Sequence, residues 1–279
     1  MKDLIKKADV LIEALPYIRK FYQKTFVFKY GGKVKEKGGD TFCEDIVLLQ
    51  YVGIKSVVVH GGGPQINRVL ERVGIESKFE KGIRITDDET MEWVEAVLQG
   101  QMNKELVREI NKLGGRAIGL SGSDGNLIVA ERVKNKRLGR VGEVKKINTD
   151  LINSLIDRGY IPVISPVGVD KNGVSLNINA DNVAAEIAAH LKAEKFFLLT
   201  DVDGVLDDKK RLIPSIRLKE IKNILKKGFI QGGMIPKLNC CSKAVEGGVK
   251  KAHIINGEIE HAILLEIFTD RGIGTEIIP

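Results

Sequence analysis

Two lysines and one aspartate, far apart in the chain, have the side-chain chemistry that phosphoryl transfer requires. Lys29 stands in FKYGG, before two glycines, Lys237 ends GGMIPK, and Asp181 ends LNINAD. Ammonium groups neutralise charge on a transferring phosphoryl group, and a carboxylate between them can orient both. Structural explanations remain open at this stage, because Lys29 could face solvent on an edge strand and Asp181 could be only a helix N-cap.

A glycine-rich stretch, VVVHGGGPQ at residues 57–65, is a candidate anion site. A strand that leaves through a glycine turn into a helix aims several backbone N–H groups at one spot, where the helix dipole adds partial positive charge. The arrangement suits a phosphoryl group, although a tight βα turn without a ligand would have the same sequence. His60 is interpreted as a structural prop of the turn. The chain contains no GxxxxGK[ST] motif, which excludes a P-loop.

Strands and helices must position these groups, and their alternation predicts a mostly parallel sheet covered by helices on both faces. Ligands of such sheets bind at the carboxyl ends of the strands, where the lysine and glycine segments lie. A capping box of Thr86 and Glu89 is expected to start a long helix over 87–113. The predicted strands are 26–30, 56–60, 116–122, 161–166, 196–201 and 252–255, with hairpins over 124–146; further predicted helices are 148–158, 181–192, 215–227, 237–247 and 258–268.

The first 20 residues predict an additional helix, because apolar residues recur there at helical spacing. Pro16 lies inside the pattern, so a kink or a break is expected at that point. Since this helix precedes the first strand, it is expected to pack on a neighbouring element or on another subunit.

Composition excludes several classes of protein. The net charge is +7, but acidic and basic residues are interspersed and aromatic residues make up only 5%, so the charge indicates a solvated surface that favours anionic ligands rather than nucleic acid. Three cysteines without a CxxC motif indicate a reducing compartment and no zinc site. No membrane-span-length apolar run and no signal peptide are present, so a cytoplasmic location is expected.

Six segments, in this order, resemble the amino acid kinase family: FKYGG, HGGGPQ, EKGIRITDDET, LNINAD, LLTDVDGVL and GGMIPK. The resemblance covers the chain from about residue 10 to the TDRGIGTEI ending, and KGIRIT and LNINAD most resemble the acetylglutamate kinases. The N-terminal helix with LPYI and the C-terminal pattern HIIN…LLEIFTDRGIG resemble those of the arginine-sensitive type. It implies an α/β fold, an αβα sandwich around a mostly parallel sheet with an extra kinked N-terminal helix. The implied division is an oligomerisation helix over 1–25, an acetylglutamate-binding lobe over 26–190 and an ATP-binding lobe over 191–279.

The implied activity is phosphorylation of the side-chain carboxylate of N-acetyl-L-glutamate with MgATP, the second step of arginine biosynthesis. Magnesium is expected to be held mainly by nucleotide phosphates and water, without a dedicated protein metal site. The resemblance assigns phosphoryl-group stabilisation to Lys29 and Lys237 and their orientation to Asp181. It assigns substrate binding to Gly62, Gly63, Arg84 and Asn177. The nucleotide-contacting residues that it implies are Asp201, Val202, Asp203, Gly204, Val205, Leu206, Phe229, Ile230 and Gln231.

Regulation is implied by the same resemblance. Some acetylglutamate kinases are inhibited by arginine and form hexamers, as trimers of dimers, through an added N-terminal helix. Arginine is expected to bind between Tyr17, His253, Glu266 and the backbone of Gly272. The sequence does not decide whether a nitrogen-signalling PII protein binds. Residues 33–39, KVKEKGG, depart from the short small-residue stretch that many relatives have in the loop expected to cover the site.

Other functions stay open. Aspartate, glutamate and carrier-linked aminoadipate kinases share the lobe architecture, although GIRIT with LNINAD favours the acetylated substrate. FFLLTDVDGVL resembles the signature of haloacid dehalogenase-type phosphatases, in which Asp201 would be a nucleophile. That motif normally opens its domain, and no later acidic pair supplies a magnesium site here. A nucleotide sensor without catalytic activity is a further alternative.

Overall fold

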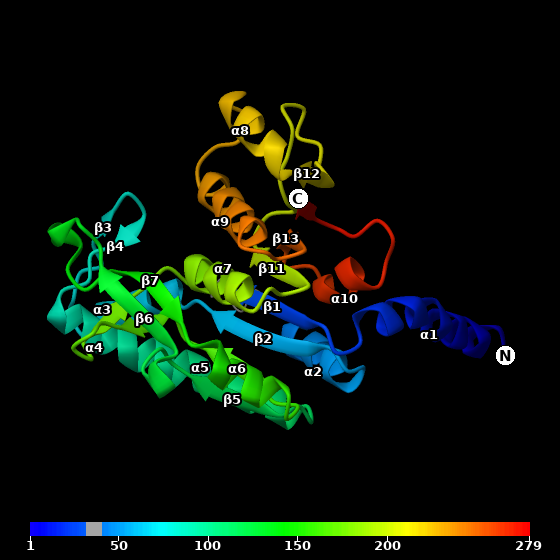
Figure 1. Ribbon diagram of the computed structural model, residues 1–279, viewed down its shortest axis with the longest axis horizontal. Coiled ribbons are helices and arrows are strands. Elements are labelled where there is room, and N and C mark those ends of the chain that lie inside the picture. Colours follow the sequence, from blue (N-terminus) through cyan, green and yellow to red (C-terminus); the bar gives the residue numbers. More distant parts are fainter. Residues whose placement is uncertain (32–40) are drawn as a thin grey trace.

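The computed structural model describes residues 1–31 and 41–279, and residues 32–40, which include the whole KVKEKGG segment, lie outside the described part. Within the described residues, an eight-stranded sheet forms the centre of the molecule (Figure 1). All neighbouring strands in it are parallel except β13 and β14. The sheet order is β12 (Ser215–Arg217), β14 (Thr275–Ile278), β13 (Lys251–Asn256), β11 (Lys195–Thr200), β1 (Thr25–Tyr30), β2 (Lys55–His60), β8 (Ile161–Ile164) and β5 (Ala117–Leu120).

Helices cover both faces of this sheet, because successive side chains of each strand point to opposite sides. On β1, Val27 belongs to a core that the helices α6, α7, α8 and α9 complete, whereas Phe26 and Phe28 belong to a second core with α2, α5 and α10. The helices are α1 (Lys2–Phe21), α2 (Phe42–Tyr51), α3 (Gly63–Arg72), α4 (Asp88–Glu95), α5 (Asn103–Lys112), α6 (Thr149–Ile156), α7 (Ala180–His190), α8 (Leu218–Lys226), α9 (Met234–Glu246) and α10 (Ala262–Ile267).

The described residues also form two smaller sheets. One has the order β10-β9-β6-β7 and the other is the hairpin of β3 and β4. Their strands are β3 (Phe79–Glu80), β4 (Ile83–Arg84), β6 (Ile128–Arg132), β7 (Gly142–Ile147), β9 (Val167–Val169) and β10 (Ser175–Asn177). Short 3₁₀ turns at Asp124–Asn126 and Lys136–Leu138 precede and follow β6. The hairpins expected over 124–146 are therefore confirmed as the antiparallel pair β6 and β7.

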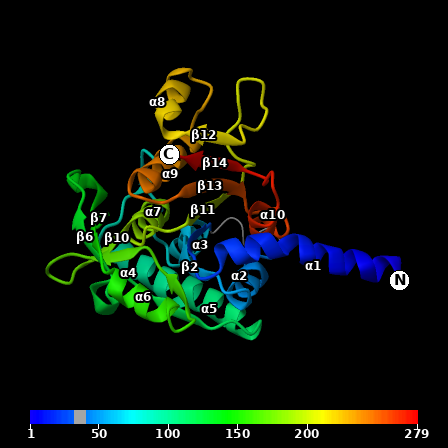
Figure 2. The same ribbon diagram turned by 45° about the vertical axis from the view of Figure 1, so that its right-hand side comes forward.

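Helix α1 extends away from the rest of the molecule in both views (Figures 1 and 2). It runs as one helix through Pro16, so the break allowed by the sequence does not occur. Figure 2 shows the first four strands of the sheet order, β12, β14, β13 and β11, side by side. Within the described ranges, none of the helices combines the length and the apolar character needed to cross a membrane.

The predicted fold class and the six predicted strands are confirmed, with ends that differ by one or two residues. The capping box was wrong: Asp87 is the N-cap of α4 and accepts from the Thr90 amide at 2.8 Å, whereas the Thr86 hydroxyl donates to the Arg84 carbonyl. The predicted 87–113 helix has a π-helical turn in its middle, at Ala96–Met102. The region 215–227 divides into β12 and α8, α9 begins at Met234, and α10 is shorter than expected.

Candidate active site

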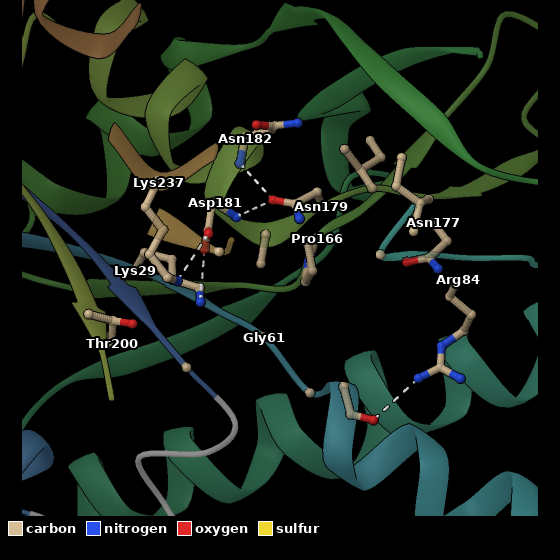
Figure 3. A pocket seen from close by; sticks show the side chains of 18 of the residues that line it. Lys29, Gly61, Arg84, Pro166, Asn177, Asn179, Asp181, Asn182, Thr200 and Lys237 are labelled. Carbon is tan, nitrogen blue, oxygen red and sulfur yellow. Dashed lines mark hydrogen bonds and ion pairs between the residues drawn. The ribbon is translucent and has the colours of Figure 1, made fainter. Parts of the chain in front are cut away.

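The carboxylate of Asp181 lies between the two predicted lysines (Figure 3). Its Oδ1 is 2.8 Å from Lys29 Nζ and its Oδ2 is 3.6 Å from Lys237 Nζ. Strand β1 is paired on one side with β2 and on the other with β11, so Lys29 is not on an edge strand. The structure therefore brings together the three residues proposed for phosphoryl transfer, from β1, α7 and α9.

The N-cap of α7 is Asn179, which leaves the Asp181 carboxylate available to the lysines. The Asn179 side chain accepts from the amides of Asp181 and Asn182, at 2.9 and 3.2 Å. The interpretation of Asp181 as an N-cap was thus wrong, and the neighbouring asparagine has that role. Behind the helix, the buried Cys240 thiol donates to the Asp181 carbonyl at 3.0 Å.

The charges at this site are mutually stabilised. Burial alone would raise the pKa of Asp181, but the nearby ammonium groups of Lys29 and Lys237 reverse this and hold that pKa below its ordinary value. The Asp181 side chain is consequently ionised at neutral pH. Burial raises the pKa of Cys240 far above its ordinary value, so this cysteine stays a neutral thiol and is not a nucleophile.

The glycine turn forms another wall of the site. Strand β2 ends at His60, Gly62 is the N-cap of α3, and α3 begins at Gly63. The amide of Gly61 donates to the Tyr30 carbonyl at 2.8 Å, which ties the turn to the end of β1. His60 is fully buried and its Nδ1 lies 3.1 Å from the Gly61 carbonyl oxygen, as expected for a prop of the turn.

Arg84 and Asn177 lie together, away from the lysines, at the right of Figure 3. Arg84 is 7% exposed and burial lowers its pKa, yet arginine remains charged in proteins. It donates to Asn67 Oδ1 at 2.6 Å, Ser77 Oγ at 2.9 Å and the Gly63 carbonyl at 3.3 Å. Asn177 donates to the Thr86 hydroxyl at 3.0 Å.

Sequence reasoning missed Asn67 and Ser77, the two side chains that hold Arg84. Asn67 lies on α3, and the only sequence feature that could have indicated its role is its position one helical turn after Gly63. Ser77 lies in the irregular connection between α3 and β3. Phe79 also contacts Arg84, with the guanidinium carbon 4.8 Å from the ring centroid.

One cavity of about 760 Å³ joins the lysines, the glycine turn and the arginine. This volume suits a nucleotide together with a small acid. Its lining also includes Thr200, Pro166, Asn179, Asn182, Gly233 and Met234.

Of the nucleotide-contacting residues implied by the resemblance, Asp201, Val202 and Gln231 line this cavity. Val205 and Ile230 are buried in the core, with Phe229 packed against the same cluster. Asp203 accepts from Asn256, Gly204 lies against Thr275, and Leu206 forms an isolated β-bridge with Leu212. The other six residues are not part of the lining of the cavity: Asp203, Gly204, Val205, Leu206, Phe229 and Ile230.

The residues named for arginine gather in a second cluster, between α1, β13 and α10. His253 Nδ1 lies 2.7 Å from Glu266 Oε1, while Glu266 Oε2 accepts from the amides of Ile273 and Gly274 at 2.6 and 3.1 Å. A side chain at Gly272 would meet the Glu266 carboxylate. The Tyr17 hydroxyl, on α1, donates to Asp270, and its ring packs edge-on against Phe268.

Lys195 completes this second cluster on its buried side. Its Nζ lies 3.2 Å from His253 Nε2 and over the ring of Phe21 from α1, at 5.2 Å. Burial lowers the pKa of Lys195 to about 8 and lowers the pKa of His253 as well. Burial opposes ionisation of Glu266 too, but the His253 hydrogen bond and the two backbone amides hold its pKa below the ordinary value.

In the part of the chain that the structure describes, no three His, Cys, Asp or Glu side chains are arranged to hold a metal ion. The cavity is lined by the cationic side chains of Lys29, Lys237 and Arg84, by the Asp181 carboxylate and by the glycine turn. Together with the αβα sandwich, this arrangement defines a phosphotransferase of the kinase type.

Comparison with known proteins identifies the family. The model of the amino acid kinase family matches residues 24–256. Acetylglutamate kinases from Pelobacter propionicus and Thermoanaerobacter pseudethanolicus are 53% and 54% identical to this chain; each comparison covers 99% of this chain, and 99% and 94% of the respective relative. The chain therefore belongs to the amino acid kinase family.

Solved structures agree with this assignment. N-acetylglutamate synthase from Neisseria gonorrhoeae, complexed with coenzyme A and N-acetyl-glutamate, has a TM-score of 0.87 at 25% identity. That match covers 98% of this chain, which spans 63% of the synthase chain. Carbamate kinase from Giardia lamblia bound to AMP-PNP has a TM-score of 0.66 at 18% identity, over 91% of this chain and 98% of that one, and shares the fold.

Proposed function

We propose that this protein transfers the γ-phosphoryl group of ATP to the side-chain carboxylate of N-acetyl-L-glutamate, in arginine biosynthesis. The observation that carries the proposal is the Asp181 carboxylate shared by Lys29 and Lys237 at the wall of one cavity, which also contains Arg84. Identity of 53–54% to acetylglutamate kinases over nearly the whole chain supports this substrate.

The reaction joins two anions, so charge neutralisation is the main task of the protein. A carboxylate oxygen of acetylglutamate attacks the γ-phosphorus; an O–P bond forms as the bond to the bridging oxygen breaks, and that electron pair leaves with ADP. The attacking carboxylate is already ionised at pH 7, so no general base is needed. Lys29 and Lys237 offset the repulsion between the partners, and correct positioning can supply ~7–11 kcal/mol of the barrier.

Arg84 is proposed to bind a carboxylate of acetylglutamate beside Asn177. A guanidinium group has five N–H donors, and three contacts from Arg84 to Asn67, Ser77 and Gly63 already fix its plane. The remaining N–H donors would bind the substrate carboxylate. The donor of the long 3.3 Å bond to the Gly63 carbonyl could also exchange that bond for one to the substrate.

The nucleotide is proposed to lie toward Asp201, Val202 and Gln231, beside the lysines. Mg²⁺ bound with ATP would supply positive charge that offsets the charge of the phosphates, and it would be held mainly by the nucleotide and by water rather than by side chains of this chain. This division of the cavity agrees with a lobe over 26–190 that binds the acid and a lobe over 191–279 that binds ATP.

A hydroxamate assay for the acyl phosphate tests the activity directly. Acetylglutamate with MgATP should produce hydroxamate in the presence of hydroxylamine, whereas glutamate and aspartate should give far less. Preference for glutamate or aspartate would reassign the substrate within the family. Phosphate release from a phosphomonoester, abolished in Asp201→Asn, would support a phosphatase instead.

Arginine is proposed as a feedback inhibitor that binds at Tyr17, His253, Glu266 and Gly272. The grouping of these residues against α1 supports the proposal. Glu266 Oε2 accepts from two amides whereas, among the described residues, Oε1 accepts only from His253, so Oε1 has a further lone pair for a guanidinium group. Inhibition that persists unchanged in Glu266→Ala would exclude this site.

A hexamer, built as a trimer of dimers, is proposed to form through α1. Leu4, Leu11 and Ile12 on this helix are 63%, 72% and 67% exposed, which is unfavourable for a helix that stays in water. Deletion of residues 1–20 should reduce the hexamer to dimers in analytical ultracentrifugation. A hexamer that survives the deletion would refute the proposed role of α1.

A further inference from the structure

We propose that His60 and Asn103 are positioning residues that fix the peptide group between Gly61 and Gly62 and thereby aim the Gly62 N–H into the cavity. This inference rests on the proposed function, since it concerns an amide that would hold a phosphoryl oxygen. It assigns a role to a buried histidine and a buried asparagine that do not line the cavity.

The side-chain orientation of Asn103 follows from its surroundings. Asn103 is 1% exposed and follows directly after the π-helical turn Ala96–Met102. One atom of its amide lies 2.8 Å from the Val163 carbonyl oxygen and 3.4 Å from that of Leu120. An oxygen in this place would be repelled by both carbonyls, so the atom is the Nδ2 donor.

The position of the ring hydrogen on His60 follows in turn. The same Nδ2 atom of Asn103 lies 3.3 Å from His60 Nε2. Because Nδ2 can only donate, Nε2 must accept, which places the ring hydrogen on Nδ1. Nδ1 is 3.1 Å from the Gly61 carbonyl oxygen and therefore donates to it, in a place that water does not reach.

Peptide geometry connects this hydrogen bond to the cavity. In a planar trans peptide, the carbonyl and the following N–H point in opposite directions. His60 holds the Gly61 carbonyl on the buried side, so the Gly62 N–H points the other way, toward the cavity that both glycines line. Glycines on both sides of the peptide impose little restriction on its rotation, so the orientation needs an external constraint.

The π-helical turn supports the same peptide from a second direction. A Cβ atom on Gly62 would lie 2.7 Å from Leu98 Cδ2 and 3.3 Å from Met102 Cγ. Leu98 and Met102 belong to the π-helical turn, and single π turns inside α-helices are frequent at functional sites. The turn therefore presents Asn103 to His60 and packs its own side chains beneath Gly62.

Two substitutions at His60 separate positioning from packing. His60→Asn places an amide nitrogen close to the Nδ1 position, and His60→Gln places it close to Nε2. Misdirecting one amide of this kind should lower kcat of His60→Gln by ~10–100-fold, while both KM values stay within ~3-fold of wild type. His60→Asn should keep kcat within ~3-fold, at a thermal midpoint similar to that of His60→Gln.

Equal kcat values for the two variants would overturn the positioning role. Wild-type turnover of acetylglutamate is measured first: its absence refutes the proposed function, whereas an active wild type with two equal variants refutes only the role of His60. If a variant does not fold, the orientation of the Gly61–Gly62 peptide is tested instead in a crystal structure of wild type with ADP, Mg²⁺, aluminium fluoride and acetylglutamate. Gly62 N should lie within hydrogen-bond distance of a fluoride while the Gly61 carbonyl stays on His60; a rotated peptide would contradict the inference.

Discussion

Lys29 on the central strand β1 forms an ion pair of 2.8 Å with Asp181 in the first turn of α7. Both side chains are mostly shielded from water, at 12% and 18% exposure, so the pair is less screened by solvent than a surface ion pair. The second oxygen of the carboxylate faces Lys237, which makes Asp181 the common counter-ion of two cations.

Asp181→Asn should lower kcat strongly, because both lysines lose the charge that fixes them. Loss of one preorganised electrostatic group typically costs ~100–1000-fold in kcat, and we expect a decrease of this order, measured with the hydroxamate assay. A variant with kcat within threefold of wild type would contradict the orienting role.

The stability that Asp181 contributes should depend on pH. Its folded pKa is lowered, so the contribution is present above the unfolded pKa, about 3.9, and is lost as pH falls through the folded value. The difference in unfolding free energy between wild type and Asp181→Asn should shrink below about pH 4. Asp157→Asn is the control, because Asp157 is 63% exposed and pairs with Lys55 at the surface. Loss of this surface ion pair should lower the unfolding free energy by at most about 1 kcal/mol.

Arg84→Lys should raise KM for acetylglutamate by ~10-fold or more with little change in kcat, because an ammonium group cannot bind a carboxylate through two parallel hydrogen bonds. Steady-state kinetics with varied acetylglutamate measures this. Arg116→Lys is a matched control: Arg116 also lies over an aromatic ring, that of Tyr160, at 4.3 Å, but it does not line the cavity. Similar KM values for wild type and Arg84→Lys would remove Arg84 from the substrate site.

Gly62→Ala should destabilise the protein by ~1–3 kcal/mol, because the added methyl group would overlap with Leu98. Gly63→Ala is the natural comparison, since a Cβ atom at Gly63 meets nothing within 4 Å. Urea denaturation of the two variants measures the difference. Equal destabilisation would show that close packing on Leu98 does not require glycine at position 62.

Lys195→Met should change the pH dependence of stability above pH 8. The folded pKa of Lys195 is lowered to about 8, so between pH 8 and about 10.5 the unfolded state binds more protons than the folded state. The unfolding free energy of wild type, relative to Lys195→Met, should therefore rise with pH over this window. Chemical denaturation at pH 7.5, 9 and 10 measures it, and a constant difference would argue against a buried, charged Lys195 at neutral pH.

Much of the fold could be predicted, because apolar strands and helical periodicity are strong signals over segments of this length. Strand β14 was missed: it has four residues and pairs antiparallel with β13 and parallel with β12, which local sequence does not indicate. The π-helical turn was also missed, since the long helix that contains it has an ordinary helical pattern on both sides.

The grouping of Lys29, Lys237 and Asp181 was predicted better than the contacts of neighbouring residues. Asparagine and aspartate are almost equally good N-caps, so LNINAD did not indicate that Asn179 would cap α7 and leave Asp181 free. Thr86 and Asp87 presented the same ambiguity. Similarly, Val205 lies in a motif next to the cavity, but its side chain points into the core, an outcome that depends on packing rather than on residue type.

Strand β1 has a mechanical consequence for any opening and closing of the protein. Its backbone is hydrogen-bonded to β2, from the proposed acetylglutamate lobe, and to β11, from the proposed ATP lobe, so one uninterrupted ladder crosses the whole molecule. The lobes therefore cannot swing on a flexible linker as independent bodies. Their approach would require a torsion of this shared sheet about β1, and Lys29 would lie close to the axis, where displacement is smallest.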